Sequence, residues 1–151
     1  MSAEERLAEL GLSVPDVAKP VAAYIPAVRS GAHVYTSGQL PMRSGELITT
    51  GKVGGEVTAD EAVECARQCA LNALAAIRVE VPLDEVHRVV KVVVFVASTP
   101  DFTGQPGVAN GVSELVGHVF GDAGRHARSA VGVPVLPLNA PVEVEMIVEV
   151  S

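Results

Sequence analysis

VHRVVKVVVFVA, residues 86–97, is the stretch that decides the fold. Valine and phenylalanine favour extended backbone, so this stretch predicts a β-strand. From Val89 to Val96 the strand is apolar on both faces and is interrupted only by Lys91. A strand of this kind needs cover on both sides of its sheet. We expect helices on one side and another subunit, rather than water, on the other.

Two amphipathic helices flank this strand in the sequence. Thr58 and Glu61 form a capping-box pattern, which predicts the start of the first helix. Pro106 in a first turn and Gly121 beyond a last turn bound the second helix. Apolar residues recur three and four positions apart in both helices: Ala62, Ala66, Cys69, Ala70, Ala73, Leu74 and Ile77 in the first, and Val108, Val112, Leu115, Val116 and Val119 in the second.

Further strands are predicted on either side of these helices. Residues 24–29 and 33–37 read as a hairpin around Ser30-Gly31. Residues 38–57 are glycine-rich and predict a loop with a short strand at 47–49. Two last strands are expected at residues 128–135 and 142–150. This order of elements predicts an α+β fold, with a mixed β-sheet and two main helices packed on one face.

The length of 151 residues predicts one domain over residues 1–151. Its first 19 residues form a helix and a connector. Ser2 and Glu5 form a second capping box, and the short apolar stripe that follows ends at Gly11. Pro15 and Pro20 flank a connector without periodicity.

The composition of the chain argues against several classes of function. There are 18 acidic and 11 basic residues, a net charge of −7, and only five aromatic side chains, so nucleic acid is not an expected partner. The longest apolar run is about half a membrane span, so no membrane association is expected. Cys65 and Cys69 are poorly spaced for a disulfide, and with no secretion signal they indicate a cytoplasmic protein. The cysteines and histidines have no metal-site spacing, and residues 51–55 lack the ending of a P-loop.

The final strand carries three carboxylates on one face. Glu143, Glu145 and Glu149 alternate with apolar residues over 142–150. An exposed strand face is ordinarily polar, so a solvated face is the simplest interpretation. If this strand pairs with 128–135, however, Arg128 approaches the glutamates and forms an ion pair or a site.

Two motifs resemble a known family. The first is RSAVGVPVLP at 128–137, followed by VEVE at 142–145, and the second is VYTSGQLP at 34–41. Together they resemble the reactive-intermediate deaminase family, also called the Rid (RidA) or YjgF family. The resemblance covers roughly residues 20–150.

This resemblance implies a chorismate-mutase-like α+β fold assembled as a homotrimer, with a small-molecule cleft between subunits. It also implies an enzyme that needs no cofactor. Active family members hydrolyse enamines and imines of the 2-aminoacrylate or 2-iminobutanoate type to 2-keto acids and ammonia. By resemblance, Arg128 binds the substrate carboxylate and Glu143 positions the attacking water.

The resemblance places further residues in the cleft as substrate contacts. They are Tyr24, Ser37, Gly38, Asn110 and Ala130, where Ala130 replaces a cysteine of archetypal members. Arg125 and His126 also depart from the usual Pro-Ala before the arginine. His126 would share the face of Arg128, as a catalytic group or as an exposed histidine.

Two other functions stay open. A non-catalytic trimer that binds small carboxylates fits the missing cysteine and the altered approach to Arg128. Endoribonuclease or translation-inhibitor activity has been attributed to family members, but the negative charge and scarcity of aromatic residues argue against it.

Overall fold

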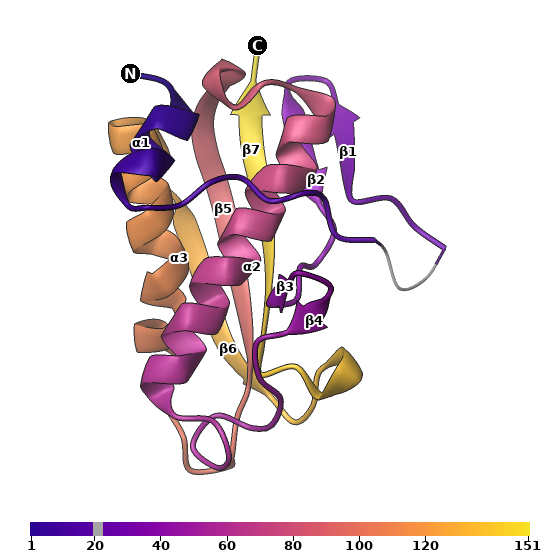
Figure 1. Ribbon diagram of the computed structural model, residues 1–151, viewed down its shortest axis with the longest axis vertical. Coiled ribbons are helices and arrows are strands. Elements are labelled where there is room, and N and C mark those ends of the chain that lie inside the picture. The colour runs from indigo at the N-terminus through magenta and orange to yellow at the C-terminus, as the bar shows by residue number, and fades with distance from the viewer. Residues whose placement is uncertain (20–22) are drawn as a thin grey trace.

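The computed structural model describes residues 1–19 and 23–151, and it forms one main sheet with helices on one side (Figure 1). Pro20, which the sequence places at the end of the connector, lies outside the described residues. The helices are α1 (Ala3–Glu9), α2 (Ala59–Glu80) and α3 (Gln105–Phe120), with short 3-10 turns η1 (Leu83–Glu85), η2 (Gly121–Gly124) and η3 (Pro137–Asn139). The strands are β1 (Ala27–Ser30), β2 (His33–Thr36), β3 (Met42–Arg43), β4 (Glu46–Leu47), β5 (Val86–Ala97), β6 (Ala127–Val133) and β7 (Val142–Val150).

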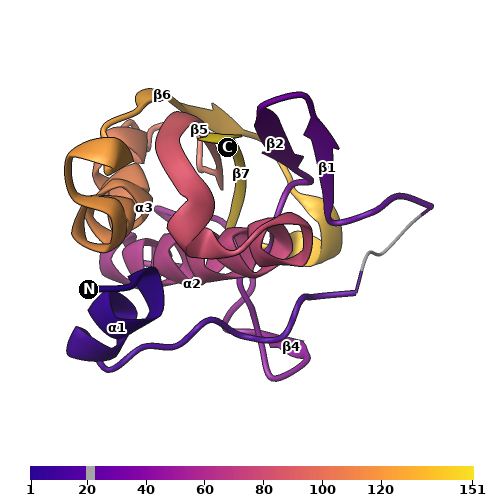
Figure 2. The same ribbon diagram turned by 90° about the horizontal axis from the view of Figure 1, so that it is seen from above.

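The main sheet has the strand order β1-β2-β7-β5-β6. Strands β5 and β6 run parallel, and the other neighbouring pairs are antiparallel. The sheet is therefore mixed, as predicted. Seen from above, α2 and α3 lie together under one face of the sheet, and α1 lies outside them (Figure 2). The predicted pair of helices on one face is confirmed.

The strand β5 has the bounds that its valines predict, and it lies inside the sheet between β7 and β6. Val92, Val94 and Val96 are fully buried toward the helices. Val93 and Phe95 point to the other face and are only partly buried in the single chain. The face opposite the helices therefore carries these apolar side chains beside Glu143 and Glu145, and it lacks cover from the residues that the structure describes.

The predicted pairing of the last two strands is wrong. Strand β5 lies between β6 and β7, with Arg128 beside Val92 and Glu143 beside Phe95. The connection between β6 and β7 therefore crosses β5 instead of forming a hairpin. Arg128 does not approach the glutamates of its own chain in the way that the sequence suggested.

Smaller differences concern the ends of elements. The first hairpin begins at Ala27 rather than Tyr24, and β6 ends at Val133. The predicted strand at 47–49 is displaced to Glu46–Leu47, where it pairs with Met42–Arg43. Both predicted capping boxes are present, with Ser2 and Thr58 as N-caps. Because capping depends on local hydrogen bonds, these two helix starts were readable from the sequence alone.

The helix α1 is fixed to the far side of α3. Leu7 is fully buried, and the backbone amide of Ala3 donates to Asp84 at 2.9 Å. His118 of α3 contacts the backbone oxygen of Arg6 at 3.0 Å. No helix among the described residues is both long and apolar enough to cross a membrane.

Helices α2 and α3 pack so closely that a side chain is excluded at Gly111. A Cβ atom there would lie 2.5 Å from the backbone oxygen of Val63. We expect Gly111→Ala to lower the free energy of unfolding by about 1–3 kcal/mol, because two backbones must separate. Gly117 of the same helix has open space around it, so Gly117→Ala should stabilise by about 0.5–1 kcal/mol. Urea denaturation followed by circular dichroism measures both, and equal signs would contradict the packing argument.

Candidate functional site

Arg128 lies on the edge strand β6 and turns toward α3. Its register partner Val92 faces the helices, and Arg128 shares that face. Arg128 Nη1 donates to Asn110 Oδ1 at 2.8 Å and to Ser113 Oγ at 3.1 Å, and Nη2 donates to the backbone oxygen of Pro106 at 3.4 Å. One helix therefore supplies all three acceptors that hold the guanidinium group.

This arrangement leaves one edge of the guanidinium open. Arginine has five N–H donors, and both hydrogens of Nη1 are engaged by Asn110 and Ser113. The Nε–H group and the second Nη2 hydrogen bond to no residue that the structure describes. Nε and Nη2 share one edge of the guanidinium group, the edge that can bind a carboxylate through two parallel hydrogen bonds. Arg128 is thus oriented to receive an anion with a planar pair of oxygens.

Ala130 lies two residues further along β6, on the same face as Arg128. Its register partner is Val94, which is buried toward the helices. Ala130 packs against the edge of the hydrophobic core. Its methyl group has no titratable or nucleophilic atom, so the surface beside Arg128 is apolar at this position.

Glu143 lies on the opposite face of the sheet, near the loop that follows β2. Its side chain is half-buried, and burial, followed by the nearby charge of Glu145, raises its pKa above the ordinary carboxyl value. A carboxylate with a raised pKa is a better proton acceptor near neutral pH. The prediction that the carboxylates of β7 share one face is therefore confirmed, and Glu143 has an environment suited to base chemistry.

Gly38 is packed directly against the carboxylate of Glu143. A Cβ atom at Gly38 would overlap that carboxylate and would lie 3.2 Å from Glu143 Cγ. Ser37 closes the same turn, because its hydroxyl donates to the backbone oxygen of Ile25 at 2.6 Å and its amide donates to Pro26 at 2.8 Å. The adjacent Tyr24 is 43% exposed. The structure thus brings Glu143, Gly38 and Ser37 together, and Tyr24 lines the same hollow as Gly38.

This contact predicts the effect of adding one methyl group. Gly38→Ala should displace the Glu143 carboxylate and lower kcat by about tenfold to a hundredfold if Glu143 acts on water. The fold should tolerate the change, because the atom that must move is the end of a flexible side chain. Steady-state kinetics and the thermal midpoint measure the two effects. Gly55→Ala, where the new Cβ meets only ordinary contacts at 3.4 Å, is the matched control.

Arg128 and Glu143 do not form one site within a single chain. They are separated by strand β5, they are three residues out of register, and they point to opposite faces of the sheet. The strand spacing and the rise per residue place their Cα atoms roughly 14 Å apart. Any site that uses both side chains must combine two copies of the chain.

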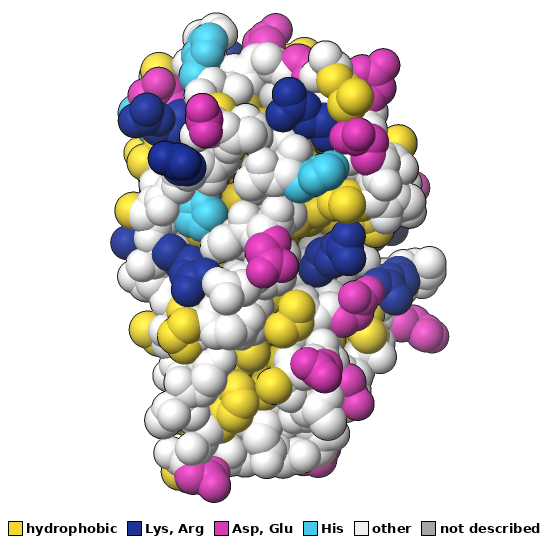
Figure 3. All heavy atoms as spheres, turned by 90° about the vertical axis from the view of Figure 1, so that its left-hand side faces the viewer, with side chains coloured by type: hydrophobic (Ala, Val, Ile, Leu, Met, Phe, Trp, Pro, Cys, Tyr) yellow, Lys and Arg dark blue, Asp and Glu magenta, His cyan; other side chains and the backbone are white. Residues whose placement is uncertain are grey.

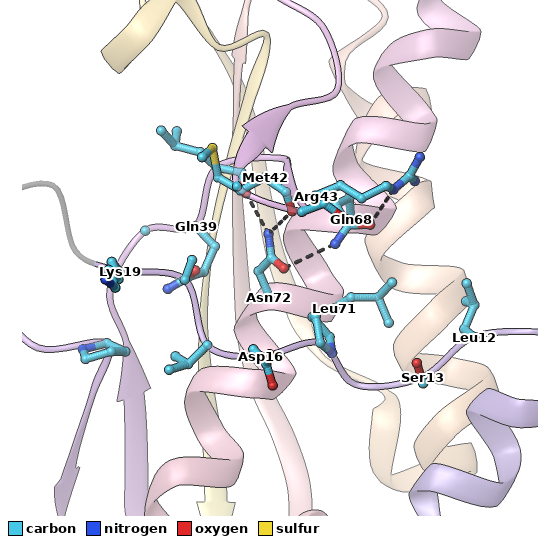
Figure 4. Close-up of a pocket in the computed structure, with 18 of the residues that line it drawn as sticks. Leu12, Ser13, Asp16, Lys19, Gln39, Met42, Arg43, Gln68, Leu71 and Asn72 are labelled. Atoms are coloured by element: carbon cyan, nitrogen blue, oxygen red, sulfur yellow. Dashed lines mark hydrogen bonds between the residues drawn. The ribbon is translucent and has the colours of Figure 1, made fainter.

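A separate hollow lies elsewhere among the described residues. It has a volume of about 870 Å³ and is enclosed by residues 11–19, the β3–β4 hairpin and α2 (Figure 4). Tyr24 and Gly38 reach its edge, but Arg128 and Glu143 do not line it. Its volume alone does not make it the reactive site, because the oriented guanidinium and the perturbed carboxylate lie outside it.

The polar wall of this hollow is occupied by internal hydrogen bonds. Asn72 Nδ2 donates to the backbone oxygens of Leu40 at 2.9 Å and Met42 at 3.0 Å. Gln68 donates to Asn72 at 3.2 Å and accepts from Arg43 at 3.2 Å (Figure 4). These buried amides tie the segment after Gly38 to α2. Their role is to fix the loop that carries Ser37 and Gly38.

The cysteines have environments that suppress reactivity. Burial, followed by the charges of Glu64 and Glu61, raises the pKa of Cys65 to about 11. Burial also raises the pKa of Cys69 well above its ordinary value. Thiols of this kind are protonated near pH 7 and are poor nucleophiles. Within 1–19 and 23–151, no group of three His, Cys, Asp or Glu side chains is placed to hold a metal ion.

Ser113 is the site residue that the sequence reasoning missed. It lies three positions after Asn110 on α3, a spacing that places two side chains on one helix face. The spacing of Asn110 and Ser113 was therefore visible in the sequence. It points to a shared site only once β6 is known to lie beside α3. His126 also joins this cluster, since its Nε2 lies 2.8 Å from Ser113 Oγ.

Comparisons with known proteins agree with this architecture. A family model described as "YjgF/chorismate_mutase-like, putative endoribonuclease" matches residues 4–150. Protein TCP17 of Trypanosoma cruzi is 45% identical over 96% of this chain and 92% of its own length. A 2-iminobutanoate/2-iminopropanoate deaminase of Dermatophagoides farinae is 35% identical over 93% of this chain and 95% of its own. The crystal structure of Atu1372, a protein of unknown function from Agrobacterium tumefaciens, superposes with a TM-score of 0.91 at 45% identity, covering 98% of this chain and 91% of that one.

A mixed sheet with two helices on one face and an arginine held at the sheet edge defines an α+β protein of the chorismate-mutase-like class. The chain belongs to the YjgF/chorismate-mutase-like family, the RidA/YjgF family that its two motifs predicted. Its relatives carry both deaminase and endoribonuclease descriptions.

Proposed function

We propose that this protein hydrolyses imines and enamines of small 2-amino acids to 2-keto acids and ammonia. The observation that carries the proposal is the open Nε/Nη2 edge of Arg128, held by Asn110 and Ser113 for a carboxylate. Glu143, with its raised pKa, supplies the base. The relative from Dermatophagoides farinae, described as an iminobutanoate and iminopropanoate deaminase, supports this substrate class.

The proposed reaction needs positioning and proton transfer only. Arg128 binds the substrate carboxylate, so the adjacent imine carbon is held in one place. Glu143 accepts a proton from water while the water oxygen bonds to that carbon and the C=N π electrons move to nitrogen. Glu143 then returns the proton to nitrogen, which gives a carbinolamine with a neutral amino group. Glu143 next takes the hydroxyl proton and delivers it to the nitrogen as the C–N bond breaks, so ammonia leaves and the carbonyl forms. No cofactor takes part in this scheme.

We also propose that the protein acts as a homotrimer with clefts between subunits. The open face of the sheet carries a group of apolar side chains, which are Val28, Tyr35, Val93, Phe95, Val131 and Ile147. Covering such a face with a second copy removes it from water. In this proposed assembly, the β6 edge that carries Arg128 of one subunit lies against Tyr24, Ser37, Gly38 and Glu143 of the next. Residues 1–151 would then form one domain of a cytoplasmic assembly.

A ligand-binding trimer without turnover is the second candidate. Ala130 favours it, because the position two residues after Arg128 offers no thiol or other reactive atom.

Nucleic-acid cleavage has less support. On the face that holds α1 and α3, basic and acidic side chains are interspersed instead of forming a basic stripe (Figure 3).

The test is the rate at which imines disappear. An amino-acid oxidase generates imines from several amino acids, and the release of ammonia and keto acid is followed with and without the protein. We expect acceleration by the native protein and none by a heat-unfolded sample. No acceleration by a folded trimer, together with calorimetric binding of 2-oxobutanoate, would favour the ligand-binding candidate.

A further inference from the structure

His126 ends a chain of hydrogen bonds that begins at Arg128. Arg128 Nη1 lies 3.1 Å from Ser113 Oγ, and Ser113 Oγ lies 2.8 Å from His126 Nε2. The other ring nitrogen, Nδ1, lies 2.6 Å from the backbone oxygen of Gly124. Three consecutive contacts therefore connect the guanidinium to the backbone of η2.

With a neutral imidazole, the chemistry of the two ends fixes the direction of every bond. The Gly124 carbonyl can only accept, so His126 Nδ1 carries a hydrogen and donates it. In the neutral ring Nε2 is then an acceptor, and the Ser113 hydroxyl must donate to it. Arg128 can only donate, so it uses a lone pair of the same hydroxyl oxygen. The hydroxyl hydrogen of Ser113 therefore points away from Arg128, and the lone pairs of Ser113 Oγ point toward Arg128.

Without the histidine the serine has another partner within reach. A serine inside a helix can donate its hydroxyl to the backbone oxygen four residues earlier, here Ala109. Such a bond would compete with the orientation that suits Arg128. His126 therefore does more than fill space, because it selects the hydroxyl rotamer that accepts from the guanidinium.

The backbone around His126 is fixed well enough for this role. Gly124 is buried against α3, and a Cβ atom there would overlap the backbone oxygen of Val116. The turn η2 therefore packs on α3 through bare backbone. This close approach presents the Gly124 carbonyl to His126 and points the ring at Ser113. The neighbouring Arg125 is not part of the arrangement, since its side chain is 87% exposed.

We propose that His126, acting through Ser113, is a positioning residue for the carboxylate-binding edge of Arg128. This inference rests on the proposed function and adds a specific role to a position where the family pattern differs. Holding both hydrogens of Nη1 fixes the plane of the guanidinium, so the free Nε/Nη2 edge has one direction. The benefit is to substrate binding rather than to the proton-transfer step.

Two substitutions separate the two contacts of the ring. The amide nitrogen of Asn can occupy the place of Nδ1, so His126→Asn keeps the donation to Gly124 and loses the acceptor for Ser113. The amide oxygen of Gln can reach the place of Nε2, so His126→Gln keeps the acceptor and loses the anchor. We expect His126→Asn and Ser113→Ala each to raise KM by about fivefold, with kcat nearly unchanged. His126→Gln should raise KM much less, and the His126→Asn/Ser113→Ala double variant should be no worse than either single one.

The same variants are titrated with 2-oxobutanoate in a calorimeter, which measures carboxylate binding without turnover. The dissociation constants should follow the order of the KM values. A larger effect of His126→Gln than of His126→Asn would show that the ring acts only as an anchor for η2, and wild-type values in both would equally overturn the proposal. Wild-type binding without turnover would refute the deaminase while the calorimetric order still decides the role of His126. Wild-type protein that neither binds nor reacts would refute both.

Discussion

Arg128→Lys is expected to lower kcat/KM by about tenfold and Arg128→Ala by about a hundredfold or more. Each hydrogen bond to a charged group contributes about 1.5–3 kcal/mol, and 1.4 kcal/mol corresponds to a factor of ten. Alanine removes both bonds to the substrate carboxylate, which accounts for the larger loss. Lysine keeps the positive charge but cannot present two parallel donors. The imine assay measures both variants.

The loss should lie mainly in KM and in the affinity for 2-oxobutanoate, because Arg128 orients the substrate and does not move a proton. Arg125→Ala is the matched control. It removes the same charge three residues away, and the Arg125 side chain is exposed, with its Nε 3.9 Å from Asp122. An equal loss in Arg125→Ala would show that general positive charge, rather than the oriented edge of Arg128, attracts the substrate.

The sequence predicted those parts of the fold that depend on interactions between residues close together in the chain. The start of α2 follows from a capping box and the bounds of β5 from a valine-rich run, both of which act within a few residues of the chain. The sides of β7 follow from strict alternation, so its buried and carboxylate faces were predicted correctly. In each case the deciding interaction is between near neighbours or with a generic apolar interior.

The strand that pairs with β6 could not be predicted from such local interactions. Eight residues separate β6 from β7, and a connection of that length suits a hairpin as well as a crossover. The outcome depends on β5, whose apolar faces compete for a central place in the sheet. As a result, the sequence indicated a direct approach of Arg128 to Glu143, whereas the fold places them on opposite faces.

The candidate site shows the same limit. Gly38, in the motif at 34–41, lies 105 residues before Glu143 in the sequence. Only the paired strands bring the two residues into contact. Gly38 was predicted as a cleft residue by resemblance alone. Its physical reason, the absence of space for a Cβ atom beside the carboxylate, became visible only in three dimensions.

Glu143→Gln is expected to reduce kcat by about a hundredfold to ten-thousandfold, the range for removal of a general base. The fold should become more stable near pH 7. Burial raises the pKa of Glu143 in the folded chain, so folding favours its protonated form. That favourable contribution is present below the ordinary carboxyl pKa and is lost as the pH rises through the raised pKa. Glutamine stays neutral at all pH values and therefore avoids the cost of burying a charge.

Urea titrations at pH 4 and pH 7 test the stability effect, and the imine assay tests the activity effect. Wild-type activity should fall on acidification through the raised pKa of Glu143, because the base must be a carboxylate. Glu145→Gln is the matched control, since it removes the neighbouring charge that contributes to the raised pKa of Glu143. The Glu145→Gln variant should keep turnover, and the acidic side of its pH–activity profile should move to lower pH. Unchanged kcat in Glu143→Gln would assign the base to another group, and loss of stability in that variant would contradict the effect of burial.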